Sequence, residues 1–303
     1  MITISEVQDL KEAERLWRAL SPQETIFDEW DFRYSFYKHK PYPLCFLVAY
    51  ERQADGREEA VGLLPLEHNK SWGGLEFFAE EHCEESRPFI KPGYENIIPK
   101  LYEATEGVVK CDDITGADKF TQSLPIEDYI YVLPLAGLET WEDYLKTRLS
   151  AKKQRNFRSD CRKVEAAEPK IFYARQADID FLFHLNSAQF DDSYLKFKED
   201  REGWKDLLAL PFNWQIIGIE VDGLVQAASL SVLYKNNYLY LINGANKTAL
   251  PGLGKYLNKV NLERALALGA NVWDAGLGDC AWKASWHLDK VPQYYFHKGA
   301  KAG

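Results

Sequence analysis

The chain has 303 residues, of which 46% are hydrophobic and 27% charged, a balance typical of a globular protein with a substantial core. This length suits two domains better than one. The net charge of -9 and the sequence pI near 5.3 exclude a protein whose whole surface binds nucleic acid, although a local basic patch remains compatible with them. The aromatic content of 14% suits deep pockets, or simply fills two cores.

The cysteines are odd in number and widely scattered, with no paired spacing, so neither a disulfide framework nor a metal site is predicted. The N-terminal segment is amphipathic and carries acidic residues throughout, unlike a secretory leader. No segment approaches the roughly 20 apolar residues that cross a bilayer. We therefore expect a soluble, cytoplasmic protein with reduced thiols, no metal and no membrane insertion. The cysteines are Cys45, Cys83, Cys111, Cys161 and Cys280.

Hydrophobic periodicity predicts an α/β unit in the first half of the chain. Its hairpin is indicated by two apolar runs around an Asp-Gly turn, and its last strand is rich in β-branched and aromatic residues. In chain order we expect a helix at residues 7–20, strands at 43–50 and 60–67 joined by a turn at 55–56, a β-like run after the turn at 72–74, a helix at 94–105 and a strand at 128–135.

The second half repeats this order, which predicts two tandem α/β units over residues 1–139 and 140–303, each a mixed sheet flanked by helices. The tail, 289–303, would be free to pack back on the first unit. In chain order we expect a long helix at residues 140–168, a helix at 177–190, hairpin strands at 212–221 and 224–234, a strand at 238–244, a helix at 253–268, a short buried strand at 271–275 and a tail strand at 291–298.

A glycine-rich turn at residues 248–257 is the sharpest local feature. Gly252 and Gly254 let backbone N–H groups approach an anion closely, and the following helix offers its N-terminal donors and the positive end of its dipole. A pyrophosphate is the natural occupant. Alone the pattern is a weak signal, since Pro-Gly is also common in ordinary loops.

Two further segments carry a family resemblance. Residues 273–286 (WDAGLGDCAWKASW) resemble the D-x-x-x-G-D-x-x-Y-K-x-x-W signature of the CelD-like, cellulose-biosynthesis-associated acetyltransferases. That family belongs to the GNAT superfamily and is related to the Fem-type aminoacyltransferases. Residues 149–163 look like the family's basic helix, in which a serine precedes spaced Arg and Lys residues. The resemblance extends from about residue 128 to 288.

This resemblance implies two GNAT-like units and an acyl-CoA co-substrate, acetyl-CoA or a longer acyl-CoA. The loop before the third helix would cradle the cofactor pyrophosphate, and the preceding strand, splayed by a bulge expected at Gly244, would polarise the thioester carbonyl. No P-G-x-G sequence occurs between Gly74 and Pro99, so the first unit is expected to lack a cofactor loop. The implied cofactor-binding residues are Asn243, Gly244, Pro251, Gly252, Leu253, Gly254 and Lys255.

Direct acyl transfer needs an acid/base group and a stabilised leaving group. Asp274 and Asp279 are the acid/base candidates, and Lys283 would neutralise developing negative charge or bind an anionic acceptor. Each also has a structural alternative: Asp274 capping a turn and Lys283 pairing with Asp279. His287 lies close by in sequence and is better explained as a bystander at helical spacing from Lys283.

One position departs from the family pattern. Trp282 stands where the family commonly has Tyr, and an indole cannot exchange a proton as a phenol can. If that tyrosine is a general acid elsewhere in the family, this chain lacks it.

The basic segment contains a marked excess of positive charge, with only Asp160 as an acid in its span. Such a field would hold phosphates, whereas a solvated helix face is the alternative. Within it Lys152, Arg155 and Arg158, together with Trp282, are the candidate acceptor- or phosphate-binding residues. The cations of the whole segment are Lys146, Arg148, Lys152, Lys153, Arg155, Arg158, Arg162 and Lys163.

Three functions are compatible with these features. The first is an acyltransferase that moves an acyl group directly from acyl-CoA to an amine or hydroxyl of a small-molecule, glycan or peptide acceptor. The second is a Fem-type aminoacyl-tRNA-dependent transferase, disfavoured by the net charge of -9 and by the absence of a coiled-coil arm. The third is a catalytically inactive GNAT-like binding protein, suggested by Trp282.

Overall fold

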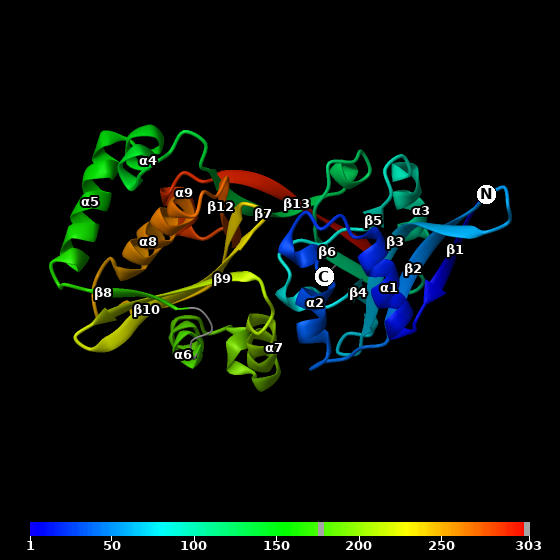
Figure 1. The fold of residues 1–303 in the computed structure, drawn as a ribbon, viewed down its shortest axis with the longest axis horizontal. Helices are drawn as coiled ribbons and strands as arrows, with labels where there is room; N and C mark the ends of the chain where they lie inside the picture. The colour runs from blue at the N-terminus through cyan, green and yellow to red at the C-terminus, as the bar shows by residue number, and fades with distance from the viewer. Residues whose placement is uncertain (175–178, 300–303) are drawn as a thin grey trace. The chain divides into compact units, whose positions relative to one another are not determined.

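The computed structural model describes residues 1–174 and 179–299, which form two compact units (Figure 1). Unit 1 comprises Met1–Tyr129 with the C-terminal residues from Pro292, and unit 2 comprises Ile130–Val291. The chain passes from unit 1 to unit 2 within strand β7 (Ile126–Pro134) and returns within β13 (Asp289–Lys298). The compact units divide inside β7, after Tyr129, whereas the sequence-based boundary was placed at residue 139, after this strand.

Unit 1 contains a mixed sheet in the order β1-β2-β3-β4-β6-β13, with β5 paired to β3. The β4–β6 pair is parallel and is limited to Leu75 opposite Val109, whereas the other pairs are antiparallel. The C-terminal part of β13 pairs with β6, so the tail strand completes this sheet. The remaining strands are β1 (Ile2–Val7), β2 (Leu44–Arg52), β3 (Glu58–Asn69), β4 (Gly74–Phe77), β5 (Phe89–Ile90) and β6 (Val109–Ile114).

Alternating side chains of β2 divide the core of unit 1 into two layers. Phe46 packs with the helices α1 (Leu10–Leu20) and α2 (Trp30–Tyr37), whereas its neighbour Leu47 packs on the other face with α3 (Ile98–Glu103). The aromatic residues therefore mainly fill this core rather than an open pocket.

Within unit 2 the strands of the sheet lie in the order β7-β12-β11-β10-β9-β8. β11 and β12 are parallel neighbours, and the other pairs are antiparallel. A tight Asp222-Gly223 turn joins the β9–β10 hairpin, and both turn residues have positive φ. The strands are β8 (Lys170–Ala174), β9 (Asn213–Val221), β10 (Leu224–Tyr234), β11 (Asn237–Ala245) and β12 (Val272–Leu277).

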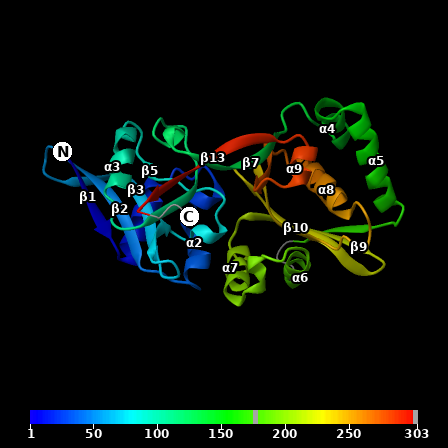
Figure 2. The same ribbon diagram turned by 180° about the vertical axis from the view of Figure 1, so that it is seen from behind.

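Helices cover both faces of the unit 2 sheet. Both views place α4, α5 and α8 on one side of this sheet and α6 and α7 on the other (Figures 1 and 2). An aromatic cluster joins the first group, in which Phe157 of α5 contacts Trp286, whose carbonyl accepts a hydrogen bond from the Tyr144 hydroxyl at 2.8 Å. The helices are α4 (Trp141–Arg148), α5 (Ala151–Glu165), α6 (Asp180–Gln189), α7 (Lys198–Leu208), α8 (Leu253–Ala267) and α9 (Ala281–Ser285).

The mixed α/β fold class is confirmed, but several elements differ from the sequence-based prediction. Residues 2–7 form a strand, because their backbone pairs with β2, and the first helix begins at Leu10 after the Asp9 cap. The single helix expected at 140–168 is two helices, since Leu149 is extended and Ser150 caps α5. Helices α2 and α7 were not predicted. Residues 177–178 of the helix expected at 177–190, and residues 300–303 of the tail, lie outside the described residues.

The described part of the chain contains no helix that is both long and apolar enough to cross a bilayer.

Candidate functional site

The parallel strands β11 and β12 separate after a short ladder. Their last paired residues are Leu239 and Asp274, beyond which β11 continues to Ala245 without pairing to β12. A β-bulge lies just after this point: Ile242 and Tyr240 pair with consecutive residues of β10, which leaves Leu241 as the extra residue. The bulge was expected at Gly244, which instead pairs in register with Ala228.

The bulge changes which face the side chains of β11 occupy. Before it, the hydroxyl of Tyr238 donates to Asn261 of α8 at 3.0 Å. After it, Gly244 faces α6, where an added Cβ would lie 2.5 Å from the backbone nitrogen of Asn186. Residues 238 and 244 would share a face in a regular strand, so the inserted residue accounts for the switch. Gly244 is thus required for close packing of α6.

The glycine-rich turn forms the N-terminus of α8. Gly252 is the N-cap, with φ of 91°, and no side chain caps this helix end. Within the described ranges, no acceptor is found for the backbone N–H of Gly252, Gly254 or Lys255. Gly254 also has open space, because an added Cβ would meet only the Ala245 side chain, at 4.0 Å. These donors and the positive end of the helix dipole form an arrangement suited to an anion.

A pocket of about 460 Å³ adjoins this turn. It lies between α5, the first turn of α8 and the end of α9, and its cations are Lys153, Lys163 and Lys255. Lys255 Nζ lies 2.5 Å from Asp160 Oδ2 and 4.5 Å from the centre of the Phe157 ring. The pair with Lys255 is the main cause that lowers the pKa of Asp160. Asp160 is therefore a negative counter-ion of Lys255 among the residues that line the pocket.

The basic helix has more partners than its sequence indicates. Arg158 is bound by Glu142 of α4 at 2.6 Å, and Arg148 by Asp289 of β13 at 3.1 Å. By contrast, Lys152 and Arg155 are exposed, and within the described chain no carboxylate pairs with either. The predicted phosphate-binding set is therefore divided: two members face solvent, and Arg158 is held on the α4 side.

Side chains of α6 bind the free edge of β11. The Asn186 amide donates to the Asn243 carbonyl at 2.7 Å, and the Ala245 N–H donates to Gln189 Oε1 at 2.6 Å. These two groups face away from β10, because the next N–H, that of Asn246, donates to the opposite side. The GNAT resemblance implies that the backbone of this strand polarises the thioester carbonyl. Two of its backbone groups, the Asn243 carbonyl and the Ala245 N–H, are thus already hydrogen-bonded to α6.

Asp274 lies where β11 and β12 separate. Its neighbour Trp273 packs with Tyr240 and Trp286 on the α8 side, so alternation places the Asp274 side chain on the opposite face. Its Oδ1 accepts the Gly276 N–H at 2.8 Å, which is the turn-capping bond considered from sequence. Burial raises the pKa of this carboxyl to about 6, while that hydrogen bond and the Lys283 charge oppose the rise.

Asp279 and Lys283 lie near Asp274 in sequence but have different partners. Lys283 is buried and donates to the Gly276 carbonyl at 2.8 Å and to the Leu277 carbonyl. Its ammonium therefore stabilises the end of β12 and the loop that follows. Asp279 is exposed; it accepts a hydrogen bond from the Tyr131 hydroxyl at 2.7 Å and lies 3.9 Å from Lys290 Nζ. The Asp279–Lys283 pair considered from sequence is not formed.

Tyr131 was missed by the sequence analysis because it lies on β7, far along the chain from the motif that it contacts. It is fully buried, and Lys283 Nζ lies 5.2 Å from the centre of its ring. Burial is the main cause that raises the pKa of Tyr131, so the phenol keeps its proton at neutral pH. Its strand pattern gave no signal of this role.

Trp282 and His287 lie at the other end of the motif. Trp282 is partly exposed and packs edge-on against Trp286. His287 lies beyond α9, with φ of 52°, and its Nε2 is 2.5 Å from Lys153 Nζ. His287 therefore lies beside the lysine pocket and not in hydrogen-bond contact with Asp274.

Unit 1 has equivalent features whose donors are already occupied. Its Pro-Gly turn before α3 has Gly93 at φ of 90°, but the Gly93 N–H donates to Glu95 at 2.9 Å. Where β4 and β6 separate, Glu80 accepts the N–H groups of Phe77 and Asp112, at 3.2 and 2.9 Å. In unit 1 a carboxylate thus binds the Pro-Gly turn, whereas the N–H groups at the start of α8 have no acceptor among the described residues, which directs attention to unit 2.

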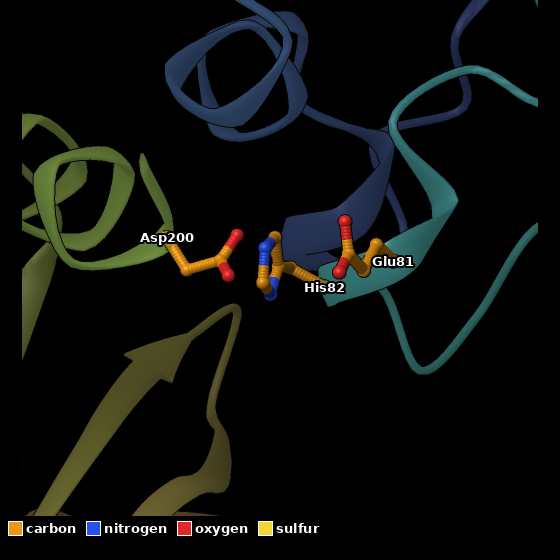
Figure 3. A group of neighbouring side chains, drawn as sticks. All are labelled: Glu81, His82 and Asp200. Atoms are coloured by element: carbon orange, nitrogen blue, oxygen red, sulfur yellow. The ribbon is translucent and has the colours of Figure 1, made fainter. Parts of the chain in front are cut away.

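Three further ionisable side chains are shown in Figure 3. Glu81 and His82 project from the 3-10 helix η2 (Glu80–His82) of unit 1, and Asp200 projects from α7 of unit 2. None of them belongs to the lysine pocket.

Comparisons with known proteins agree with this geometry. Residues 151–284, from α5 to α9, match the family model described as an acetyltransferase (GNAT) domain. A tandem GNAT protein from the clavulanic acid biosynthesis pathway is similar over 100% of both chains, with a TM-score of 0.55 and 10% identity. The chain has a tandem GNAT fold. No curated protein matches the chain.

Two other solved structures are similar in fold to this chain. FemX is similar over 97% of this chain and 96% of its own, with a TM-score of 0.62 and 9% identity. L-PGS from Bacillus licheniformis is similar over 98% of this chain and 94% of its own, with a TM-score of 0.59 and 11% identity. The matched domain and the shared fold support a transferase of the GNAT superfamily.

Proposed function

We propose that unit 2 transfers an acyl group from an acyl-CoA thioester directly to an amine or hydroxyl acceptor. The observation that carries this proposal is the set of N–H groups at Gly252, Gly254 and Lys255, which have no acceptor in the described part of the chain and lie beside a pocket that contains three lysines. A diphosphate satisfies all of these groups at once, because it carries several negative oxygens on one compact group. Within the superfamily, the CelD-like motif at residues 273–286 makes that family our finer placement.

The residues around the α8 N-terminus are suited to bind the phosphates of acyl-CoA, whereas the β11 edge is less suited to bind its pantetheine arm. Lys255 and the α8 N-terminus would hold the diphosphate, and Lys153 or Lys163 the 3′-phosphate. The Ala245 N–H would have to exchange its bond to Gln189 for one to the donor. Acyl-CoA supplies the activated carbonyl carbon, and this chain's groups orient it and move protons.

Asp274 is the general base in this proposal. Its pKa of about 6 leaves the carboxylate ionised at neutral pH but still able to accept a proton. The acceptor's nitrogen or oxygen forms a bond to the carbonyl carbon, its proton passes to Asp274, and the carbon–sulfur bond breaks. Tyr131 then supplies the proton to the departing thiolate, a role for which Trp282 has no suitable group. Lys283 holds the loop that joins these residues.

Thermal unfolding with added acetyl-CoA and longer acyl-CoAs tests the donor. A ligand at a hundredfold excess over its Kd stabilises the native state by about 2.7 kcal/mol, so Tm should rise clearly for the wild type. The Lys255→Gln variant should show a smaller rise. No rise with any acyl-CoA would contradict this donor.

A second candidate is an aminoacyl-tRNA donor, as in Fem-type transferases. It is favoured by Gln189 and Asn186, which cover the β11 edge that pantetheine would use, and by the exposed cations Lys152 and Arg155. A gel shift with tRNA that weakens steeply with salt, and is lost in the Lys152→Gln/Arg155→Gln double variant, would support this candidate.

The proposal of an acyl-CoA-dependent transferase also includes a cytoplasmic location and an acceptor that is a small molecule, a glycan or a peptide.

A further inference from the structure

A second pocket, of about 710 Å³, lies on the other side of unit 2. It is formed by α6, the 3-10 helix η5 (Tyr194–Lys196) and α7, all of which belong to unit 2. The lysine pocket described above is formed by α5, α8 and α9, which cover the opposite face of the sheet (Figures 1 and 2). The two pockets therefore cannot be parts of one cavity. This volume is within the range of small-molecule sites.

The charges around this second pocket are unbalanced. Four Lys or Arg side chains and one His line it, against the carboxylates of Asp180 and Glu202. Lys205 pairs with both of these acids, at 3.1 and 4.0 Å. Within residues 1–174 and 179–299, no carboxylate pairs with Lys198 or Arg201. The four cations of the pocket outnumber its two carboxylates by two, in a protein with a net charge of -9.

Apolar surface completes the pocket. Phe183 of α6 and Leu195 of η5 line it and are almost fully buried, so they form an apolar base beneath the charged side chains. An apolar base with cations at the rim suits a ligand that has an apolar body and an anionic end.

We propose that the α6–α7 pocket binds an organic anion in which one phosphate or carboxylate is attached to an apolar or aromatic body. Arg201 and Lys198 hold the anion, and Phe183 and Leu195 contact the body. This site goes beyond the proposed acyl transfer and does not use the N-terminus of α8. Phosphate and carboxylate ligands share the chemistry that Arg recognises with paired donors.

Isothermal titration with 1-naphthyl phosphate, 1-naphthoate, inorganic phosphate and neutral 1-naphthol tests this site. We expect one of the two naphthyl anions to bind at least tenfold more tightly than inorganic phosphate, and the neutral naphthol to bind no more tightly than inorganic phosphate. The tighter of the two naphthyl anions identifies whether phosphate or carboxylate is preferred. Absence of binding by both naphthyl anions would overturn the proposal.

Variants locate the binding. Arg201→Gln and Lys198→Gln should each lower the affinity for the naphthyl anion roughly tenfold, because each removes one charge-assisted hydrogen bond. Lys11→Gln, at an exposed lysine of α1, and Lys255→Gln, in the lysine pocket, should bind as the wild type does. If Lys255→Gln loses binding while Arg201→Gln keeps it, the anion occupies the donor pocket, and only the present inference fails. Equal Tm values for all four variants would exclude unfolding as the cause.

Discussion

At the scale of single residues, burial raises the pKa of Asp274 to about 6, above its ordinary value of 3.8. A base must be deprotonated to act, so transfer should fall as pH drops below about 6. Asp274→Asn should lower kcat by about 10²–10⁴-fold and remove this acid limb. A pH profile of kcat/KM for both proteins measures the effect. If kcat/KM of Asp274→Asn still fell below about pH 6 as in the wild type, a group other than Asp274 would cause that fall.

The same shift predicts the effect of Asp274 on stability. Its folded pKa is raised, so the native state binds more protons than the unfolded chain between about pH 4 and 6, and stability falls as pH rises through this window. Asp274→Asn should therefore be relatively more stable at pH 7 than at pH 4, apart from any loss of the Gly276 turn.

Asp160 lines the lysine pocket, where it pairs with Lys255. Asp160→Asn should strengthen inorganic pyrophosphate binding roughly five- to tenfold, because one nearby negative charge is removed from a partly screened site. Glu165→Gln is the matched control, since Glu165 lies on the same helix and faces Lys259 of α8 at 3.8 Å. Affinity measured by titration should not change in that control. Weaker binding by Asp160→Asn would mean that Asp160 positions Lys255 rather than competing with the ligand.

At the scale of elements, close packing of α6 on β11 depends on a missing side chain. Gly244→Ala would place a Cβ 2.5 Å from the Asn186 backbone nitrogen, so unfolding free energy should fall by about 1–3 kcal/mol. Gly254→Ala is the matched control, because its Cβ meets nothing closer than 4.0 Å and Ala favours a helix. Urea unfolding should show a loss for the first and no loss for the second. Equal midpoints would contradict the close contact.

The elements also show what sequence patterns could predict. The two strand-like runs on either side of the Asp222-Gly223 turn predicted the β9–β10 hairpin, and it is present. The bulge at Leu241 could not be located from sequence, because Leu is an ordinary strand residue and only pairing with β10 reveals the insertion. The break at Ser150 was missed because basic residues continue across it. Tyr131 and Asp279 meet through pairing of β7 and β12, which no local pattern encodes.

At the scale of the whole molecule, unit 1 carries buried acids that should control the pH dependence of stability. Desolvation raises the pKa of Glu67 to about 8, and one of its oxygens has no hydrogen-bond partner among the described residues. The native state therefore binds more protons than the unfolded chain between about pH 4.5 and 8, and stability falls across that window. Glu67→Gln should remove this fall, so its Tm should exceed that of the wild type more at pH 9 than at pH 5. Parallel Tm curves would contradict the burial of an uncompensated acid.

The tandem arrangement was predictable because both halves repeat one order of elements, whereas the role of each half was not. Gly93 and Gly252 both follow a proline in a turn before a helix. The Gly93 N–H donates to the carboxylate of Glu95, two residues later, whereas the Gly252 N–H has no acceptor among the described residues. Sequence could place Glu95 there, but only the structure shows its hydrogen bond. Function is therefore assigned to unit 2 from contacts rather than from the motif alone.

The measurement that most directly tests the account is an amide NMR titration with inorganic pyrophosphate and then acetyl-CoA. Both ligands should shift the backbone amides of Gly252, Gly254 and Lys255, because each would gain an anionic acceptor, while the Gly93 amide should not move. If the three unit 2 amides stay unchanged at saturating ligand, the α8 N-terminus does not bind the donor, and the proposed acyl transfer from CoA at this site is wrong.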